Sequence, residues 1–237
     1  MIKRFLKRMK NLFFPKPEII FQYNTYAQVG EDSIISFIFA DKGHKSIKYL
    51  DVGTNLPNEL NNTYLFYTRG YRGVCVEADK SLIPLINSVR PEDKIINMGV
   101  SMCDSLESDF YIFDVKGLNT FDVNEANERV KSDFCKLVEV AKVQLITIDK
   151  IIEENFETYP DFMSIDIEGL DYDVLNSLDF EKYPIPVVCV ETCIFSDNHI
   201  RSKDFKFIEL MKEKGYEVYA DTYVNSIFVN KNWFYSN

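Results

Sequence analysis

The chain has 237 residues, and its 37 Asp and Glu against 27 Lys and Arg leave a formal net charge of −10. This length suits one large α/β domain, and a hydrophobic fraction of 46% is typical of a folded globular protein. The acidic balance argues against a nucleic-acid partner, because phosphate binding depends on clustered Lys and Arg. No segment approaches the roughly 18 consecutive apolar residues of a membrane-spanning helix.

The cysteines and the N-terminal segment bear on where the protein works. The five cysteines include no CxxC pair, so we expect a cytoplasmic protein without a zinc site or disulfides. Residues 1–14, MIKRFLKRMKNLFF, place apolar side chains at helical spacing among five Lys or Arg. Such a helix either lies on the inner face of a membrane or packs on the domain or on a partner. Pro15 and Pro17 end it, which predicts a basic segment over 1–17 and a single domain over 18–237.

Helix-like and strand-like segments then alternate along the chain. In chain order we predict a helix over 28–40, a strand over 48–52, a helix over 63–68, a strand over 74–77, a helix over 81–89, strands over 94–100 and 109–113, a helix over 123–140, strands over 143–148 and 161–167, a helix over 170–178, a strand over 186–191, a helix over 202–214 with Ser202 as its N-cap, and strands over 216–222 and 226–230. This order favours an α/β fold with a mostly parallel sheet, helices on both faces and an antiparallel terminal hairpin.

Four predicted strands end in an acidic residue: Asp51, Glu77, Asp166 and Glu191. In open α/β sheets, ligands bind beyond the carboxyl ends of the strands. One such carboxylate is often a helix cap or a solvated charge, whereas four on one rim indicate a binding site.

The turn after the first strand favours an adenosine cofactor without a pyrophosphate. Gly53 allows a close approach to the backbone, and Glu77 follows Asp51 by 26 residues, a spacing suited to an acid that accepts both ribose hydroxyls. A dinucleotide site needs G-x-G-x-x-G, but the loop over 53–58 holds one glycine. S-adenosylmethionine is therefore the predicted cofactor, and an NAD-dependent oxidoreductase is disfavoured.

A second group of acids follows the strand over 161–167. Strand alternation points Asp166 and Glu168 to the same side as the chain leaves the sheet. These acids suit three tasks: positioning a substrate hydroxyl, accepting its proton, or holding a divalent cation. The alternative is that Asp171 or Asp173 merely caps the next helix, which we accept for Asp173.

Several blocks together resemble the FkbM family of S-adenosylmethionine-dependent methyltransferases, which have the seven-stranded, Rossmann-like class I fold. The resemblance spans about residues 22–230 and rests on the blocks over 26–32, 49–53, 61–64, 70–77, 161–169, 215–218 and 225–229. It implies that the cofactor contacts are made by Gln28, Asp32, Asp51, Gly53, Asn55, Glu77, Ala78 and Ser101. Asp51 and Gly53 would border the methionine part, Glu77 the ribose, and Ala78 and Ser101 the adenine.

The resemblance also implies O-methylation of a sugar, a glycan or a glycolipid. Because the sulfonium methyl is already activated, the enzyme must align the acceptor oxygen and accept its proton. We assign the proton to Asp166 or Glu168 and the orientation of the acceptor to Glu191. Four alternatives stay open: a cation that bridges Asp166 and Glu191, a natural-product acceptor, a nucleic-acid substrate, which the acidic charge disfavours, and a partner subunit that binds the cofactor without catalysis.

Overall fold

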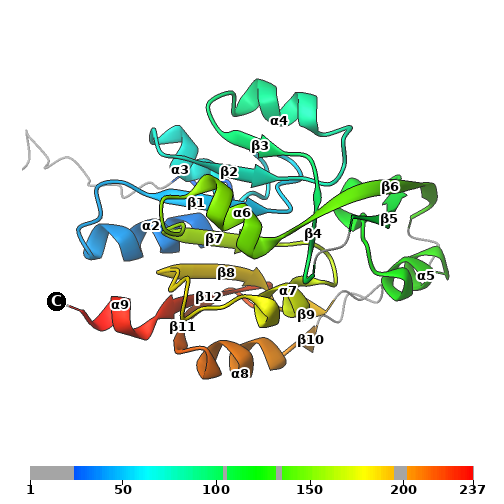
Figure 1. Ribbon diagram of the computed structural model, residues 1–237. Coiled ribbons are helices and arrows are strands. Elements are labelled where there is room, and N and C mark those ends of the chain that lie inside the picture. Colours follow the sequence, from blue (N-terminus) through cyan, green and yellow to red (C-terminus); the bar gives the residue numbers. More distant parts are fainter. Residues whose placement is uncertain (1–23, 104–105, 132–134, 195–201, 237) are drawn as a thin grey trace, which may run out of the picture.

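The computed structural model describes residues 24–103, 106–131, 135–194 and 202–236 (Figure 1). The predicted basic segment over 1–17 lies outside these residues. A seven-stranded sheet has the order β11-β12-β8-β7-β1-β2-β3. Its strands are β1 (Lys48–Val52), β2 (Arg72–Val76), β3 (Lys94–Ile96), β7 (Phe162–Ile165), β8 (Val187–Glu191), β11 (Tyr216–Asp221) and β12 (Asn225–Asn230). All neighbouring strands are parallel except β12, which runs antiparallel to β8 and β11. The predicted sheet and terminal hairpin are confirmed.

Helices cover both faces of this sheet, because its central strands are apolar on both sides. In β7, Met163 and Ile165 face one core, and Phe162 faces the other. The first core is completed by α6 (Ile148–Asn155), α7 (Asp171–Ser177) and α8 (Lys206–Glu213), and the second by α2 (Glu31–Asp41), α3 (Tyr64–Thr68) and α9 (Lys231–Tyr235). A separate cluster packs α4 (Ile83–Val89) against β2 and β3. Continuous burial on both faces explains the near-continuous apolar runs of these strands.

A smaller unit is inserted between β3 and α6 and lies beside the main sheet (Figure 1). It contains β4 (Gly99–Ser101), β5 (Glu107–Phe113), the 3-10 helix η1 (Lys116–Leu118), α5 (Val123–Lys131) and β6 (Leu137–Thr147), with the strand order β4-β6-β5. The predicted strand over 94–100 is therefore wrong, because β3 and β4 belong to different sheets. The Asn97 side chain between them donates to the carbonyls of Glu77 and Ala78, which interrupts the strand.

Two further predictions fail for reasons of tertiary structure. The helix predicted over 123–140 ends at Lys131, because residues from Leu137 onward pair with β5 in antiparallel register. The predicted N-cap Ser202 instead begins the short strand β10 (Ser202–Lys203), which pairs with β9 (Cys193–Ile194). α8 begins only at Lys206, whose N–H is 3.1 Å from Asp204 Oδ1.

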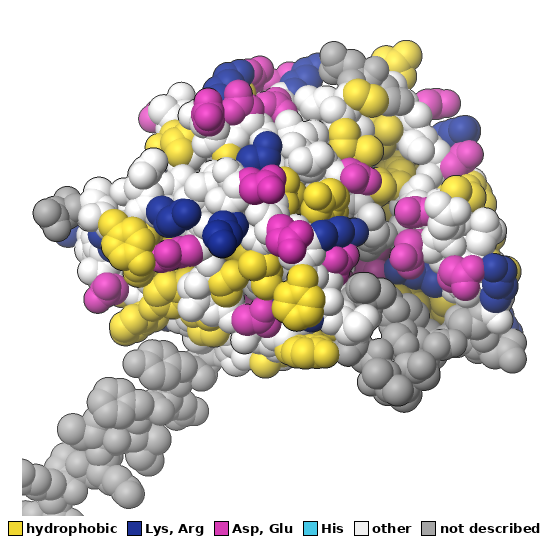
Figure 2. Space-filling model, turned by 90° about the horizontal axis from the view of Figure 1, so that it is seen from below, with side chains coloured by type: hydrophobic (Ala, Val, Ile, Leu, Met, Phe, Trp, Pro, Cys, Tyr) yellow, Lys and Arg dark blue, Asp and Glu magenta, His cyan; other side chains and the backbone are white. Residues whose placement is uncertain are grey.

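The described surface is mixed in charge on the side that carries α8. Seen from there, Lys and Arg side chains alternate with Asp and Glu, and apolar groups lie between them (Figure 2). Among the described helices, none has the length and apolar character needed to cross a membrane.

Candidate active site

The carboxyl ends of β1 and β2 are locked together by backbone and carboxylate contacts. The N–H groups of Gly53 and Thr54 both donate to the Val76 carbonyl. The Glu77 carboxylate accepts from the N–H of Asn55 and from that of Asp79, each at 2.8 Å. Burial raises the pKa of Glu77 to about 7, although these two N–H groups oppose the shift. The predicted ribose acid is thus held in place, and it titrates near neutrality.

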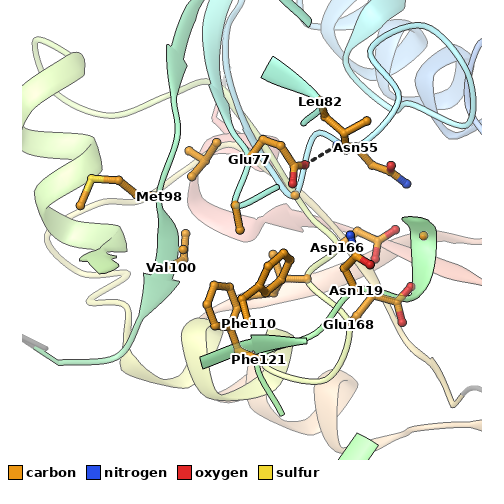
Figure 3. Close-up of a pocket in the computed structure, with 16 residues that line it drawn as sticks. Asn55, Glu77, Leu82, Met98, Val100, Phe110, Asn119, Phe121, Asp166 and Glu168 are labelled. Atoms are coloured by element: carbon orange, nitrogen blue, oxygen red, sulfur yellow. Dashed lines mark hydrogen bonds between the residues drawn. The ribbon is translucent and has the colours of Figure 1, made fainter. Parts of the chain in front are cut away.

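A hollow opens at this edge of the sheet, between the β1 turn, the end of β2 and the inserted unit (Figure 3). Its apolar side is formed by Leu82, Met98, Val100, Phe110 and Phe121, and its polar side by Asn55, Glu77, Asn119, Asp166 and Glu168. An apolar wall beside a row of carboxyl and amide groups suits a ligand with a flat ring at one end and hydroxyls or charges at the other. Ala78 also lines it, and its contact with the adenine stays a prediction.

Gly53 allows the β1 turn to lie directly against the Asp166 backbone. Its φ is +82°, and a Cβ there would lie 1.8 Å from the Asp166 carbonyl oxygen. The glycine therefore allows the turn after β1 to pack against the loop after β7. Packing alone requires a glycine here, whether or not a ligand is bound.

Gly53→Ala is expected to destabilise the protein by about 1–3 kcal/mol through the backbone clash, beyond the cost of a left-handed alanine. Gly70→Ala is the matched control, because Gly70 has φ +89° and a Cβ there would meet nothing within 4 Å. Urea unfolding of both variants checks this. Equal losses of stability in the two would contradict the role of the close approach.

Three acids gather beyond β7 and β8: Asp166, Glu168 and Glu191. One carboxylate oxygen from each lies within 4.8 Å of the others. Asp166 is exposed to solvent at this rim. Crowding by protein atoms and then the charges of Glu191 and Glu168 raise the pKa of its carboxyl. The three predicted catalytic residues are thus brought together, and their oxygens could serve as proton acceptors or as ligands of a hard divalent cation.

The loop that carries Glu168 has an unusual backbone. Glu168 has φ +54° and Gly169 has φ +110°. The buried Asp171 carboxylate accepts from the N–H groups of Ile167 (2.9 Å) and Gly169 (3.2 Å). Asp171 therefore holds the preceding loop, while Asp173 is exposed on α7.

Glu168 is also bound by the inserted unit. Arg129 Nη2 donates to Glu168 Oε2 at 2.7 Å, and Thr120 Oγ1 donates to the Glu168 carbonyl at 2.7 Å. Burial raises the pKa of Glu168 to about 7, the Arg129 charge lowers it, and the Asp171 charge raises it. The sequence analysis missed Arg129, since an arginine at the end of a polar helix is typical of a solvated face.

Asp51 belongs to a buried ion-pair network. Its carboxylate accepts from Asn61 Nδ2 at 3.0 Å, from Thr63 Oγ1 at 2.8 Å and from Arg90 Nη1 at 3.2 Å. Arg90 is fully buried and also binds Asp93 at 2.8 Å. The sequence analysis missed both Arg90 and Asp93. The role of Asp51 beside the methionine part stays a prediction, and its carboxylate is not among the groups that line the hollow.

Three other predicted cofactor residues also lie outside the lining of the hollow. Ser101 donates to the Cys103 carbonyl at 2.8 Å. Buried Asp32 accepts from Thr25 Oγ1 and the Tyr26 N–H, so it fixes the segment before α2. Gln28 is exposed. Their predicted contacts with the cofactor remain predictions.

Comparison with known proteins identifies the family. A family model described as the methyltransferase FkbM domain matches residues 51–218. The chain belongs to the FkbM methyltransferase family. This match covers the end of β1, all of β2, β7 and β8, and the inserted unit, and so every residue that lines the hollow. The resemblance stated from the sequence is thereby confirmed, and this FkbM-family chain is an S-adenosylmethionine-dependent methyltransferase.

Three solved methyltransferases are distantly similar to this FkbM-family enzyme. A TehB-like enzyme from Corynebacterium glutamicum is 11% identical over 97% of each chain, with a TM-score of 0.38. The 1,6-didemethyltoxoflavin-N1-methyltransferase of Burkholderia thailandensis, with S-adenosylhomocysteine bound, is 10% identical over 96% of this chain and 84% of its own, with a TM-score of 0.41. The glycopeptide N-methyltransferase MtfA is 10% identical over 86% and 90%, with a TM-score of 0.40. A search of curated proteins found no match. The acceptor does not follow from these similarities.

The hollow fits S-adenosylmethionine by the chemistry of its lining. Within the described part of the chain, Asn55 Oδ1 is buried and has no hydrogen-bond partner, so it can accept from a ligand. Glu77 would hold the ribose, and the apolar wall with Leu82 and Val100 suits the adenine. When bound, the cofactor supplies an activated methyl group.

Proposed function

We propose that this enzyme transfers a methyl group to a hydroxyl oxygen of a sugar, a glycan or a glycolipid. The observation that carries the proposal is the cluster of Asp166, Glu168 and Glu191 between two hollows. Asp166 and Glu168 line the cofactor hollow, and Glu168 and Glu191 line a second one. A hydroxyl bound in the second hollow would therefore lie beside carboxylates. It would also be next to the hollow that holds the cofactor, because Glu168 lines both.

The chemistry of hydroxyl methylation supports a carboxylate at this place. The acceptor oxygen forms a bond to the methyl carbon while the bond from sulfur to that carbon breaks, and the hydroxyl proton then passes to a base. Asp166 suits this role by its position, because its carboxylate lines the cofactor hollow, lies beside those of Glu168 and Glu191, and is exposed to solvent, which can take up the proton.

The charge of the second hollow supports an uncharged acceptor. Five carboxyl groups line it, at Glu125, Glu168, Asp171, Glu191 and Asp204, against two basic groups, at Arg129 and Lys206. Both basic groups already bind carboxylates, because Arg129 pairs with Glu168 and Lys206 pairs with Asp204. An acceptor that carries a phosphate or a carboxylate would meet excess negative charge, whereas a neutral polyol would not.

Asp166→Asn is expected to lower turnover by about 10²–10⁴-fold, since the amide cannot accept the proton. The assay follows methyl transfer from ¹³C-methyl-labelled cofactor to a panel of neutral glycosides and amino sugars, and the product's carbon shift distinguishes a methoxy group from an N-methyl group. Asp173→Asn is the control, because Asp173 is an exposed acid close by on α7. Turnover at the wild-type rate in Asp166→Asn would rule out the assigned base, and an N-methyl product would rule out the acceptor oxygen.

The version with a bridging cation makes a separate prediction. The same three carboxylates could hold a divalent ion that polarises the acceptor hydroxyl. Treatment with EDTA distinguishes a mechanism that needs the cation from one in which a carboxylate accepts the proton without a metal. Loss of activity that Mg²⁺ or Mn²⁺ restores supports the cation, whereas undiminished activity supports the proton acceptor alone.

A further inference from the structure

One buried side chain of the inserted unit joins two walls of the cofactor hollow. Arg129 on α5 is 2% exposed. Its Nη2 donates to Glu168 Oε2 at 2.7 Å, and its Nη1 donates to the Leu118 carbonyl. Leu118 ends η1, and its neighbours Gly117 and Asn119 line the hollow, as does Glu168. The same guanidinium thus binds the loop after β7 and the wall over 117–119.

The backbone of Glu168 needs such support. A non-glycine residue at φ +54° lies in the left-handed region, which costs on the order of 1–3 kcal/mol when the surroundings impose it. Two of the groups that hold it come from the inserted unit: Arg129 binds the carboxylate, and Thr120 Oγ1 binds the carbonyl. Removing either releases one end of a strained residue.

The inserted unit reaches the main sheet's loops at a third point. Asn119 Nδ2 donates to Asp79 Oδ2 at 3.3 Å, and the Asp79 N–H in turn donates to Glu77. The wall over 117–119 is therefore joined to Asp79 directly and to Glu168 through Arg129. Of the three side chains of the inserted unit that make these contacts, at Asn119, Thr120 and Arg129, only Arg129 carries a charge, and it is buried.

We propose that Arg129 is a positioning residue of the cofactor pocket, which holds Glu168 and the wall over 117–119 in the arrangement that binds S-adenosylmethionine. It acts through these two groups, since Arg129 borders the second hollow and is not among the residues that line the cofactor hollow. The planar guanidinium suits the task, because its fixed N–H groups donate in two directions at once.

A double-mutant cycle tests this with S-adenosylhomocysteine as the probe, so that no acceptor is needed. Calorimetry measures the affinity of the wild type, Arg129→Met, Glu168→Gln and the double variant. Arg129→Met is expected to bind about tenfold more weakly or worse, since hydrogen bonds to charged groups are lost. The double variant is expected to bind no more weakly than the weaker single variant, because both changes remove the same contact.

Two further variants keep the test decisive if Arg129→Met folds poorly. Arg129→Lys keeps the charge but cannot reproduce the paired donors, so we expect an intermediate affinity. Lys131→Met on the same helix is the control, because Lys131 is exposed and pairs with Glu128. Wild-type affinity in Arg129→Lys, or losses that multiply in the double variant, overturns the proposal. Since no methyl transfer is measured, a wrong acceptor would leave this result untouched.

Discussion

Arg90→Ala is expected to destabilise the fold by about 3–5 kcal/mol, a large share of the ~5–15 kcal/mol available to a typical domain. The guanidinium is fully buried and binds the carboxylates of Asp51 and Asp93. Its Nη2 also donates to Thr63 Oγ1 at 2.9 Å. Removing it leaves two buried carboxylates without their cation, and an uncompensated buried charge is far more costly than an exposed one.

Urea unfolding followed by circular dichroism measures this loss. Arg69→Ala is the control, because Arg69 is exposed and directly follows the last residue of α3. A second variant separates charge from packing: Asp51→Asn combined with Arg90→Met removes one carboxylate and the cation together, and we expect it to recover part of the stability. Exposed ion pairs contribute less than about 1 kcal/mol. A loss that small in Arg90→Ala would show that the buried ion pairs of Arg90 do not stabilise the fold.

Glu77→Gln is expected to weaken the binding of S-adenosylhomocysteine by about 10–100-fold and to remove its pH dependence near neutrality. Burial raises the pKa of Glu77 to about 7 in the free protein, so the carboxyl is largely protonated below that pH. Ribose hydroxyls donate best to the ionised form, and binding therefore favours proton loss. Affinity should rise as pH increases through about 7 and level off above it.

Calorimetry between pH 6 and 8 checks both parts of this expectation. At pH 7 the measured heat should change with the ionisation enthalpy of the buffer, because binding releases part of a proton from Glu77. Glu59→Gln is the control, since Glu59 is exposed in the loop after β1. A wild-type affinity that is flat across this range, or that falls with rising pH, would show that another group governs binding.

Local patterns in the sequence predicted the main sheet well. The apolar run over 48–52 coincides with β1, and the run over 186–191 differs from β8 by one residue, because both are buried on both faces. The acids Asp166, Glu168 and Glu191 were also expected together. The carboxyl ends of parallel strands share one edge of a sheet, so their positions along the chain suffice to bring them near one another.

The inserted unit could not be predicted in the same way. Residues 137–140 follow a polar helix and were predicted to extend it, but they form the start of β6 because β5, about thirty residues earlier, offers a pairing edge. The first four side chains of β6 are all exposed, so an alternating pattern marks only the later part of the strand. Pairing between distant segments overrides local propensity in such cases.

By itself, the sequence determined the α/β fold, the single-glycine turn with Glu77, and the acids beyond β7 and β8, since all of these depend on residue type and order along strands. Only the tertiary structure decided which charges are paired. Arg90 and Arg129 look like surface residues in the sequence, yet each is buried against carboxylates from distant segments. A buried cation is stable only beside such partners, and the folded chain alone brings them together.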